Sequence, residues 1–315
     1  MYSVGIDLGG TNIAVGVIDE NNKIIGRGKE KTFSERNAEE IFASMAKAVN
    51  SALGDAKITL SEVKSIGIGT PGSVDKENGI IVYANNLNFH NVPARDILKK
   101  YFDTEIYIDN DANCAALGEA VAGAGEGKKS FVAVTLGTGV GSGLIVDGKI
   151  VTGCNDAGGE CGHMVITVDG EECTCGRKGC WEAYASATAL IKQTKEAMNK
   201  DKNSVMWSLC ENDIDNVSGR TAFDAMRAGD KTGKEVVERY IKYVSVGTVN
   251  LINALQPEVL CFGGGICNEG DTLLEPIREY VRRERYSKYA EKQTVICRAV
   301  LGNDAGIIGA ALLDR

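Results

Sequence analysis

Histidine, proline and aromatic residues are scarce in this chain of 315 residues, which has two histidines, four prolines and 6% aromatics. No apolar run is long enough to cross a bilayer, so we expect no membrane partner. No dense lysine and arginine run occurs, and the formal net charge is −8. A protein that binds nucleic acid needs a basic face, so we expect no nucleic-acid partner either. The chain opens on a strand pattern without the segments of a secretory signal.

Glycine, in contrast, is abundant, with 38 residues. Many glycines indicate many places where the backbone turns tightly or approaches a ligand. The hydrophobic share of 43% and charged share of 25% are typical of a globular protein with a sizeable core. The ten cysteines, in a long chain without a signal, indicate reduced thiols and a cytoplasmic location.

The length of the chain predicts about two domains, and hydrophobic periodicity predicts a mixture of strands and helices. We expect residues 1–112 to form a small domain to which 300–315 return, and residues 113–299 to form a larger one. The predicted strands are 2–8, 13–19, 23–32, 64–69, 105–109, 131–136, 258–262 and 294–299. The predicted helices are 38–53, 95–102, 111–123, 184–199, 221–228, 233–255, 274–285 and 305–313.

Two stretches of the chain share one pattern. "VGIDLGGTNIAVGVIDENNKII" and "VAVTLGTGVGSGLIVDGKIV" both run from an apolar strand through Leu-Gly and a glycine-rich turn to a second strand. Leu8, Gly9 and Asp19 match Leu136, Gly137 and Asp147 at one constant offset along the chain. We interpret this as a duplicated β-hairpin that begins each domain, although any two glycine-turned hairpins look alike.

Three glycine-rich turns are candidate phosphate sites. The first, 7–12, offers backbone N–H groups at Gly9 and Gly10, donors at Thr11 and Asn12, and in Asp7 a carboxylate that can hold Mg²⁺ through water. The others are 137–143 and 263–265. None follows the strand, G-x-G-x-x-G, helix order of dinucleotide folds, so together they favour ATP over NAD.

A histidine and three cysteines form the strongest local motif: His163, Cys173, Cys175 and Cys180. Three thiolates and an imidazole within one short stretch of chain are a tetrahedral ligand set suited to structural Zn²⁺. Free buried thiols, or a disulfide between two of the three, are the alternatives.

Carboxylates gather at two further places. Asp111 follows a strand and opens a helix, where it can act as a general base or merely cap the helix. Glu160 and Glu182 flank the cysteine-rich loop together with His163, and such groups can bind the hydroxyls of a sugar. Taken alone, Glu182 is typical of a surface charge.

These motifs resemble the ROK sugar kinases, and among them bacterial glucokinases, over essentially the whole chain. The matching segments, in order, are "IDLGGTN", "GIGTPGSVD", "IDNDANCAALGE", "LGTGVGSGLIVDGKI", "GGECGH", "CTCGRKGCWEAYAS" and "FGGGI".

The resemblance implies an actin/hexokinase-like, ribonuclease H-like fold of two α/β domains with the active site in the cleft between them. It implies ATP-dependent phosphorylation of a hexose, most simply glucose, with Asp111 as general base, and it implies a homodimer. By resemblance, the sugar would contact Gly72, Asn110, Asp111, Glu160, His163 and Glu182. ATP and Mg²⁺ would contact Asp7, Gly9, Gly10, Thr11, Asn12, Thr138, Gly139 and Gly264, and Zn²⁺ would be held by His163, Cys173, Cys175 and Cys180.

One departure from the family concerns Phe89, where relatives often carry a tryptophan near the sugar. Phenylalanine would keep a stacking surface there but lose the indole donor. Other functions also fit the resemblance. They are a sibling kinase for fructose, allose or N-acetylmannosamine, a non-catalytic sugar-binding protein, and a sugar-responsive transcriptional regulator. We expect no regulator, because no winged helix precedes the Asp7 motif.

Overall fold

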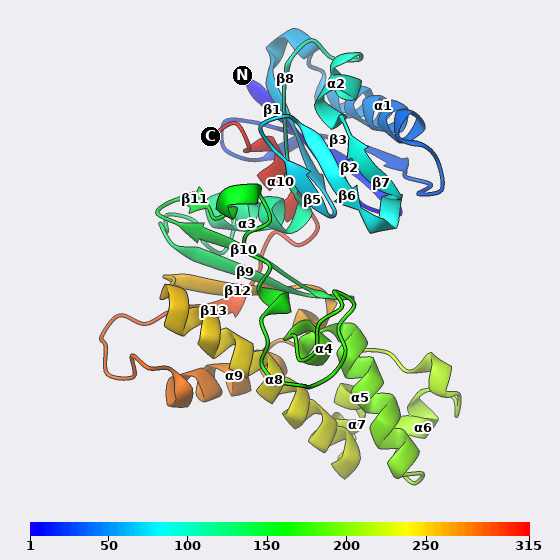
Figure 1. Ribbon diagram of the computed structural model, residues 1–315, viewed down its shortest axis with the longest axis vertical. Coiled ribbons are helices and arrows are strands. Elements are labelled where there is room, and N and C mark those ends of the chain that lie inside the picture. The colour runs from blue at the N-terminus through cyan, green and yellow to red at the C-terminus, as the bar shows by residue number, and fades with distance from the viewer. The chain divides into compact units, whose positions relative to one another are not determined.

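A computed structural model describes residues 1–315, and its contacts divide the chain into two compact units (Figure 1). Unit 1 comprises 1–133, 143–159 and 299–315, and unit 2 comprises 134–142 and 160–298. The returning segment 299–315 is therefore part of the unit that contains the N-terminus. No helix is both long and apolar enough to span a membrane.

Unit 1 is built on a five-stranded sheet in the order β3-β2-β1-β4-β8. β1 pairs with β2 in antiparallel and with β4 in parallel orientation, and β4 pairs with β8 in parallel. The strands are β1 (Tyr2–Leu8), β2 (Asn12–Ile18), β3 (Ile24–Lys31), β4 (Val63–Thr70) and β8 (Glu105–Asn110). Because β1, β4 and β8 run parallel, their carboxyl ends meet at one edge of the sheet.

Helices cover this sheet where small residues allow close contact. A Cβ atom added to Gly5 or Gly67 would lie 1.8 Å from a carbonyl oxygen of α10 (Asp304–Ala311), so the helix packs directly on these glycines. α10 also packs against α3 (Asp111–Ala122), while α1 (Ala38–Ala56) packs on β2 and β3. α2 (Ala94–Lys99) lies beside β8.

A second five-stranded sheet has the order β11-β10-β9-β12-β13. Its strands are β9 (Phe131–Leu136), β10 (Val140–Val146), β11 (Lys149–Ile150), β12 (Val259–Gly263) and β13 (Val295–Arg298). In both sheets the first strand along the chain (β1 or β9) lies in the centre. The second and third strands follow on one side, and the fourth and fifth on the other. The two hairpins predicted from the constant sequence offset therefore occupy the same place in two sheets of matching strand order. The second hairpin does not begin unit 2, because residues 131–133 and 143–159 belong to unit 1.

A third sheet, of order β5-β6-β7, was not predicted from the sequence. Its strands are short: β5 (Ser73–Asp75), β6 (Ile80–Ala84) and β7 (Phe89–Val92). The expectation for Phe89 was wrong, because this side chain is 2% exposed and its ring lies 6.5 Å from that of Phe42 in the core. It offers no stacking surface to a sugar.

The remaining helices lie in unit 2. They are α4 (Glu182–Ala185), α5 (Ala187–Lys200), α6 (Met206–Leu209), α7 (Thr221–Arg227), α8 (Lys231–Leu255) and α9 (Asp271–Glu284). The single helix predicted over 184–199 is in fact split at Ser186. Ser186 has extended backbone, and its side chain accepts the N–H of Ala189, so it starts a new helix as an N-cap.

Candidate functional site

Helix α3 places Asp111 at the strand edge of unit 1. The N-cap is Asn110, whose Oδ1 accepts the N–H groups of Ala112 and Asn113 at 2.8 and 3.3 Å. Asp111 is the first helical residue, is exposed and accepts the N–H of Ala112 at 2.8 Å. The N-cap role considered for Asp111 is therefore wrong, and its carboxylate lies at the carboxyl ends of the parallel strands, where open α/β sheets bind ligands.

Gly72 is fixed beside the junction of β8 and α3, which we call the catalytic corner (109–113). Asn110 Nδ2 donates to the Gly72 carbonyl at 3.0 Å, so both predicted sugar-binding residues are in contact. Gly72 has φ of +87°, and a Cβ here would lie 1.9 Å from the Tyr83 carbonyl oxygen. Only glycine fits this close approach to β6.

Asp7 lies in β1 at the same edge and is partly buried. Burial, and then the charge of Asp111, raise the pKa of Asp7 from 3.8 to about 6. Two carboxylates that repel each other in a partly dehydrated place are a site that a cation would stabilise. The residues therefore fit the Mg²⁺ that accompanies a nucleotide.

The turn after Asp7 is tight, because the Gly9 N–H donates to the Asn12 carbonyl at 3.0 Å. The Gly9 carbonyl accepts the hydroxyl of Thr32 at 2.6 Å, which fixes the turn to the end of β3. Asn12 Oδ1 is buried and has no hydrogen-bond partner within the chain. An orphaned polar atom next to a glycine turn suits a bound polar ligand.

Asp109 was not predicted as a site residue, yet its contacts stabilise the catalytic corner. It is 1% exposed, forms an ion pair with Lys76, and its Oδ1 accepts Asn113 Nδ2 at 2.9 Å and the Asn110 N–H at 2.7 Å. Lys76 and Asp109 are far apart in the chain. No local pattern could have indicated their pairing.

In unit 2, two of the predicted glycine turns lie together. Gly264 has φ of +93°, and a Cβ on it would lie 2.3 Å from the Leu136 carbonyl oxygen, directly before the turn at 137–139. Thr138 accepts the Thr188 hydroxyl at 2.8 Å through its carbonyl. Gly139 lies against Glu182, because an added Cβ would be 2.3 Å from Glu182 Oε2. The structure thus brings Thr138, Gly139 and Gly264 to one edge of the second sheet.

Glu182 is the first residue of α4 and is partly buried, so its interpretation as a surface charge is wrong. Its Oε2 accepts the N–H of Val140 at 3.0 Å, and its Oε1 lies 3.6 Å from the sulfur of Cys173. Glu182 therefore joins the glycine turn to the cysteine-rich loop. Glu160, in contrast, is exposed, and its carbonyl accepts the N–H of His163 at 3.1 Å.

The four predicted metal ligands are close together, with their ligand atoms all within 4.8 Å of one another. His163 Nδ1 is 3.6 Å from Cys173 Sγ, and the sulfurs of Cys175 and Cys180 are 3.7 Å apart. Tetrahedral zinc with Zn–S bonds of about 2.3 Å requires ligand separations of about 3.7 Å. All ten cysteines are free, so the disulfide alternative is wrong. The residues fit a tetrahedral cation.

A buried tryptophan, which was not predicted as a site residue, anchors this loop. Trp181 is fully buried. Its indole Nε1 donates to the Tyr243 carbonyl at 2.9 Å, and its backbone N–H donates to the Met164 carbonyl at 2.8 Å. Its ring lies against Gly247 of α8, where an added Cβ would be 2.1 Å from it. Burial raises the pKa of the neighbouring Cys180 thiol to about 12.

The two five-stranded sheets have the same strand order, and each has a glycine turn after its first strand. These features define a protein of the actin/hexokinase-like class. The fold class predicted from the sequence is confirmed. More narrowly, the chain belongs to the ROK family, whose model matches residues 3–315.

Similar proteins share this assignment over nearly their full length. The chain is 35% identical to a glucokinase of Thermotoga maritima over 99% of its own length and 96% of the relative's. A crystal structure of a ROK family glucokinase from Streptomyces griseus, in complex with glucose and AMPPNP, has 32% identity, a TM-score of 0.81 and 99% coverage of both chains. A ROK hexokinase from Thermus thermophilus has 33% identity and a TM-score of 0.84, with 99% and 97% coverage.

Proposed function

We propose that this protein is an ATP-dependent hexose kinase that converts glucose to glucose 6-phosphate. The observation that carries the proposal is the exposed carboxylate of Asp111, held at the carboxyl ends of three parallel strands by the cap at Asn110. Full-length similarity to a glucokinase and to a glucokinase structure with bound glucose and an ATP analogue supports glucose as the substrate.

In this reaction Asp111 takes the proton of the sugar 6-hydroxyl as its oxygen attacks the γ-phosphorus of ATP, and ADP leaves. In phosphoryl transfer, the protein mainly positions the reactants and stabilises the charge of the transition state. Asn110 and the backbone of Gly72 position the sugar alcohol, while Glu160, His163 and Glu182 bind ring hydroxyls. The glycine turns at Gly9, Gly10 and Gly264 offer N–H groups to the nucleotide, together with Thr11, Asn12, Thr138 and Gly139.

We propose that the protein uses two metals, a Mg²⁺ ion that accompanies ATP and a structural Zn²⁺ ion. Asp7 would help to hold the Mg²⁺ that accompanies ATP, and this cation would offset the negative charge of the phosphates. Structural Zn²⁺ is held by His163, Cys173, Cys175 and Cys180, whose spacing supports tetrahedral coordination. When bound, zinc fixes the imidazole of His163, so a residue that reads the sugar keeps one orientation.

The location and assembly are proposals of the same kind. Ten free cysteines and the need for ATP support a reducing, ATP-containing compartment, the cytoplasm. A homodimer is supported only by the family resemblance, and light scattering on the purified protein would measure its mass.

A panel of hexoses with ATP tests the substrate. We expect the highest kcat/KM for glucose, measured by ADP release and by identification of the 6-phosphate. A higher value for fructose, allose or N-acetylmannosamine would replace glucose by that sugar, and no phosphorylation of any sugar would refute the kinase.

The variant Asp111→Asn tests the general base. It keeps the size of the side chain but removes the basic oxygen, so we expect kcat to fall by about 10²-fold or more while glucose binding is retained. Turnover equal to that of the wild type would refute the role of Asp111.

A further inference from the structure

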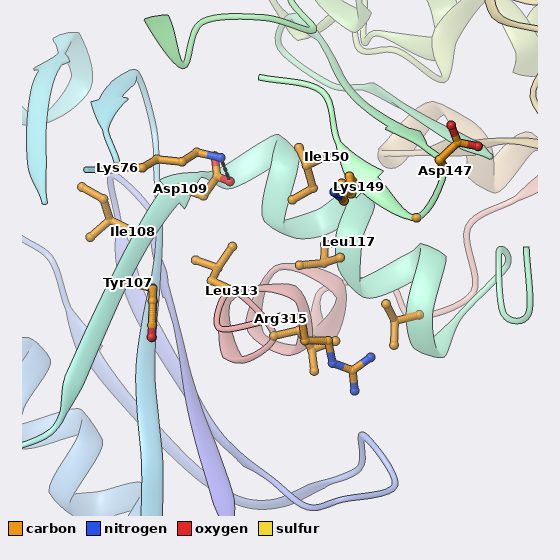
Figure 2. A pocket seen from close by; sticks show the side chains of 13 residues that line it. Lys76, Tyr107, Ile108, Asp109, Leu117, Asp147, Lys149, Ile150, Leu313 and Arg315 are labelled. Atoms are coloured by element: carbon orange, nitrogen blue, oxygen red, sulfur yellow. Dashed lines mark hydrogen bonds and ion pairs between the residues drawn. The ribbon is translucent and has the colours of Figure 1, made fainter. Parts of the chain in front are cut away.

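Unit 1 contains a pocket of about 620 Å³ that belongs to none of the predicted sites. Figure 2 shows it between the edge strand β8, helix α3, the turn between β10 and β11, and the C-terminal segment. Its volume lies in the range of small-molecule sites, about 300–1,000 Å³. It is therefore large enough for a metabolite.

The lining combines an apolar floor with positive charge. Leu117, Ile150 and Leu313 supply apolar surface, and Lys76 and Lys149 supply ammonium groups. Of the two acidic residues that line the pocket, Asp109 is already paired with Lys76 and 1% exposed, and the carboxylate of Asp147 points away from the other labelled residues in Figure 2. This lining suits a ligand with an apolar body and one anionic group.

The pocket is linked to the catalytic corner through one side chain. Lys76 is 28% exposed at the pocket and forms an ion pair with Asp109, whose Oδ1 accepts the Asn110 N–H at 2.7 Å. Asn110 in turn caps the helix that begins with Asp111. An anion that binds Lys76 weakens its hold on Asp109, and this changes the support of the catalytic carboxylate.

The backbone of Lys76 is anchored, so its side chain is the part that can respond. Its N–H donates to Asp156 Oδ2 at 3.2 Å, and its carbonyl accepts Arg95 Nη2 at 2.8 Å. A ligand in the pocket therefore acts on the ammonium group without displacing the strand and loop around it.

We propose that this pocket binds a small metabolite with an apolar body and one carboxylate or phosphate group, and that its occupancy regulates the kinase through Lys76. The regulatory half rests on the proposed function, whereas the binding half does not. Nothing in the proposed reaction uses this pocket.

Binding is tested with 8-anilinonaphthalene-1-sulfonate, which has an aromatic body, one anionic group and fluorescence that rises in apolar surroundings. We expect saturable binding of one equivalent to the wild type. Leu313→Trp, which fills the pocket, and Lys149→Glu, which reverses its charge, should each weaken binding about tenfold or more. The matched control Val300→Trp, at an exposed position of unit 1 that does not line this pocket, should bind as the wild type does. Equal binding by Leu313→Trp and the wild type would overturn the proposal.

Competition identifies the anionic group. Displacement of the probe by 4-methylbenzoate supports a carboxylate ligand, and displacement by phenyl phosphate supports a phosphate ligand. Failure of both to displace it would overturn the proposed ligand class.

Coupling is tested by adding the probe to the glucose kinase assay. We expect kcat or KM of the wild type to change about fivefold, while Leu313→Trp keeps its own basal rate. Bound probe without effect, or an equal effect on Leu313→Trp, would overturn the regulatory half. A wild type with no turnover before the probe is added would instead refute the proposed function and leave the binding result standing.

Discussion

Asp7 makes the protein less stable than it would be with a neutral side chain, if no cation is bound. Its pKa is raised from 3.8 to about 6 by burial and by Asp111. A carboxyl whose folded pKa exceeds its unfolded value holds its proton more tightly in the folded state. Its ionisation therefore costs stability above pH 6, and this cost disappears as the pH falls through 6 and below 3.8.

The magnitude follows from the difference in pKa. Raising the pKa of Asp7 from 3.8 to about 6 corresponds to about 3 kcal/mol at pH 8. Because Asp7 is only partly buried, solvent screening reduces this, and we expect about 1–3 kcal/mol. The variant Asp7→Asn removes the charge at nearly constant volume, so it should increase the free energy of unfolding of the metal-free protein by this amount at pH 8. At pH 5 the gain should fall to about half.

The assay is urea denaturation in EDTA, without nucleotide, at pH 8 and pH 5. Asp103→Asn, at an exposed position of unit 1, serves as the control and should change stability by less than about 0.5 kcal/mol. Kinase activity of Asp7→Asn should fall even as its stability rises, since the Mg²⁺ site is lost. A variant less stable than the wild type at pH 8, or a gain independent of pH, would refute the reasoning.

Three further substitutions test the contacts around the site. Lys76→Met leaves a carboxylate of 1% exposure without its cation, and we expect a loss of about 3 kcal/mol in urea denaturation together with a lower kcat. Cys180→Ser should abolish the zinc content, about one per chain by mass spectrometry in the wild type, and raise KM for glucose about tenfold; unchanged KM would contradict the role of the metal. Gly247→Ala, although alanine favours helices, should lower stability by about 1–3 kcal/mol through its clash with Trp181. The control Gly54→Ala, also in a helix but with open space around it, should instead be neutral or stabilising by up to about 1 kcal/mol.

The sequence predicted best what depends on neighbours along the chain. Strand β1 over Tyr2–Leu8 and β9 over Phe131–Leu136 were predicted with the bounds that the structure has, because their apolar runs end at glycine turns. The zinc ligands from Cys173 to Cys180 lie within one short loop, so spacing alone indicated them. The strands β5 to β7 were missed because they are short and alternate irregularly with polar residues.

Contacts between distant segments could not be predicted from local patterns. The pairing of Lys76 with Asp109 depends on how β5 is placed beside β8. The contact between Trp181 and Gly247 is of the same kind. From the sequence alone, a glycine inside a helix only predicts a less stable helix. The structure shows that it leaves room for the indole ring. Which residue caps a helix is also a matter of backbone geometry, and this decided between Asn110 and Asp111.

The duplicated sheet provides an internal control for the role of Asp7. The same offset that aligns Leu8 with Leu136 places Thr135 opposite Asp7, so the second copy has no carboxylate at this position of its first strand. Both sheets nevertheless have the same strand order and a glycine turn at the same place. The hairpin therefore forms without an acid, and folding does not explain why a partly buried carboxylate with a raised pKa stands in the first copy. A destabilising charge that the architecture does not need is best explained by what it binds, and in this unit that is the cation that accompanies the nucleotide.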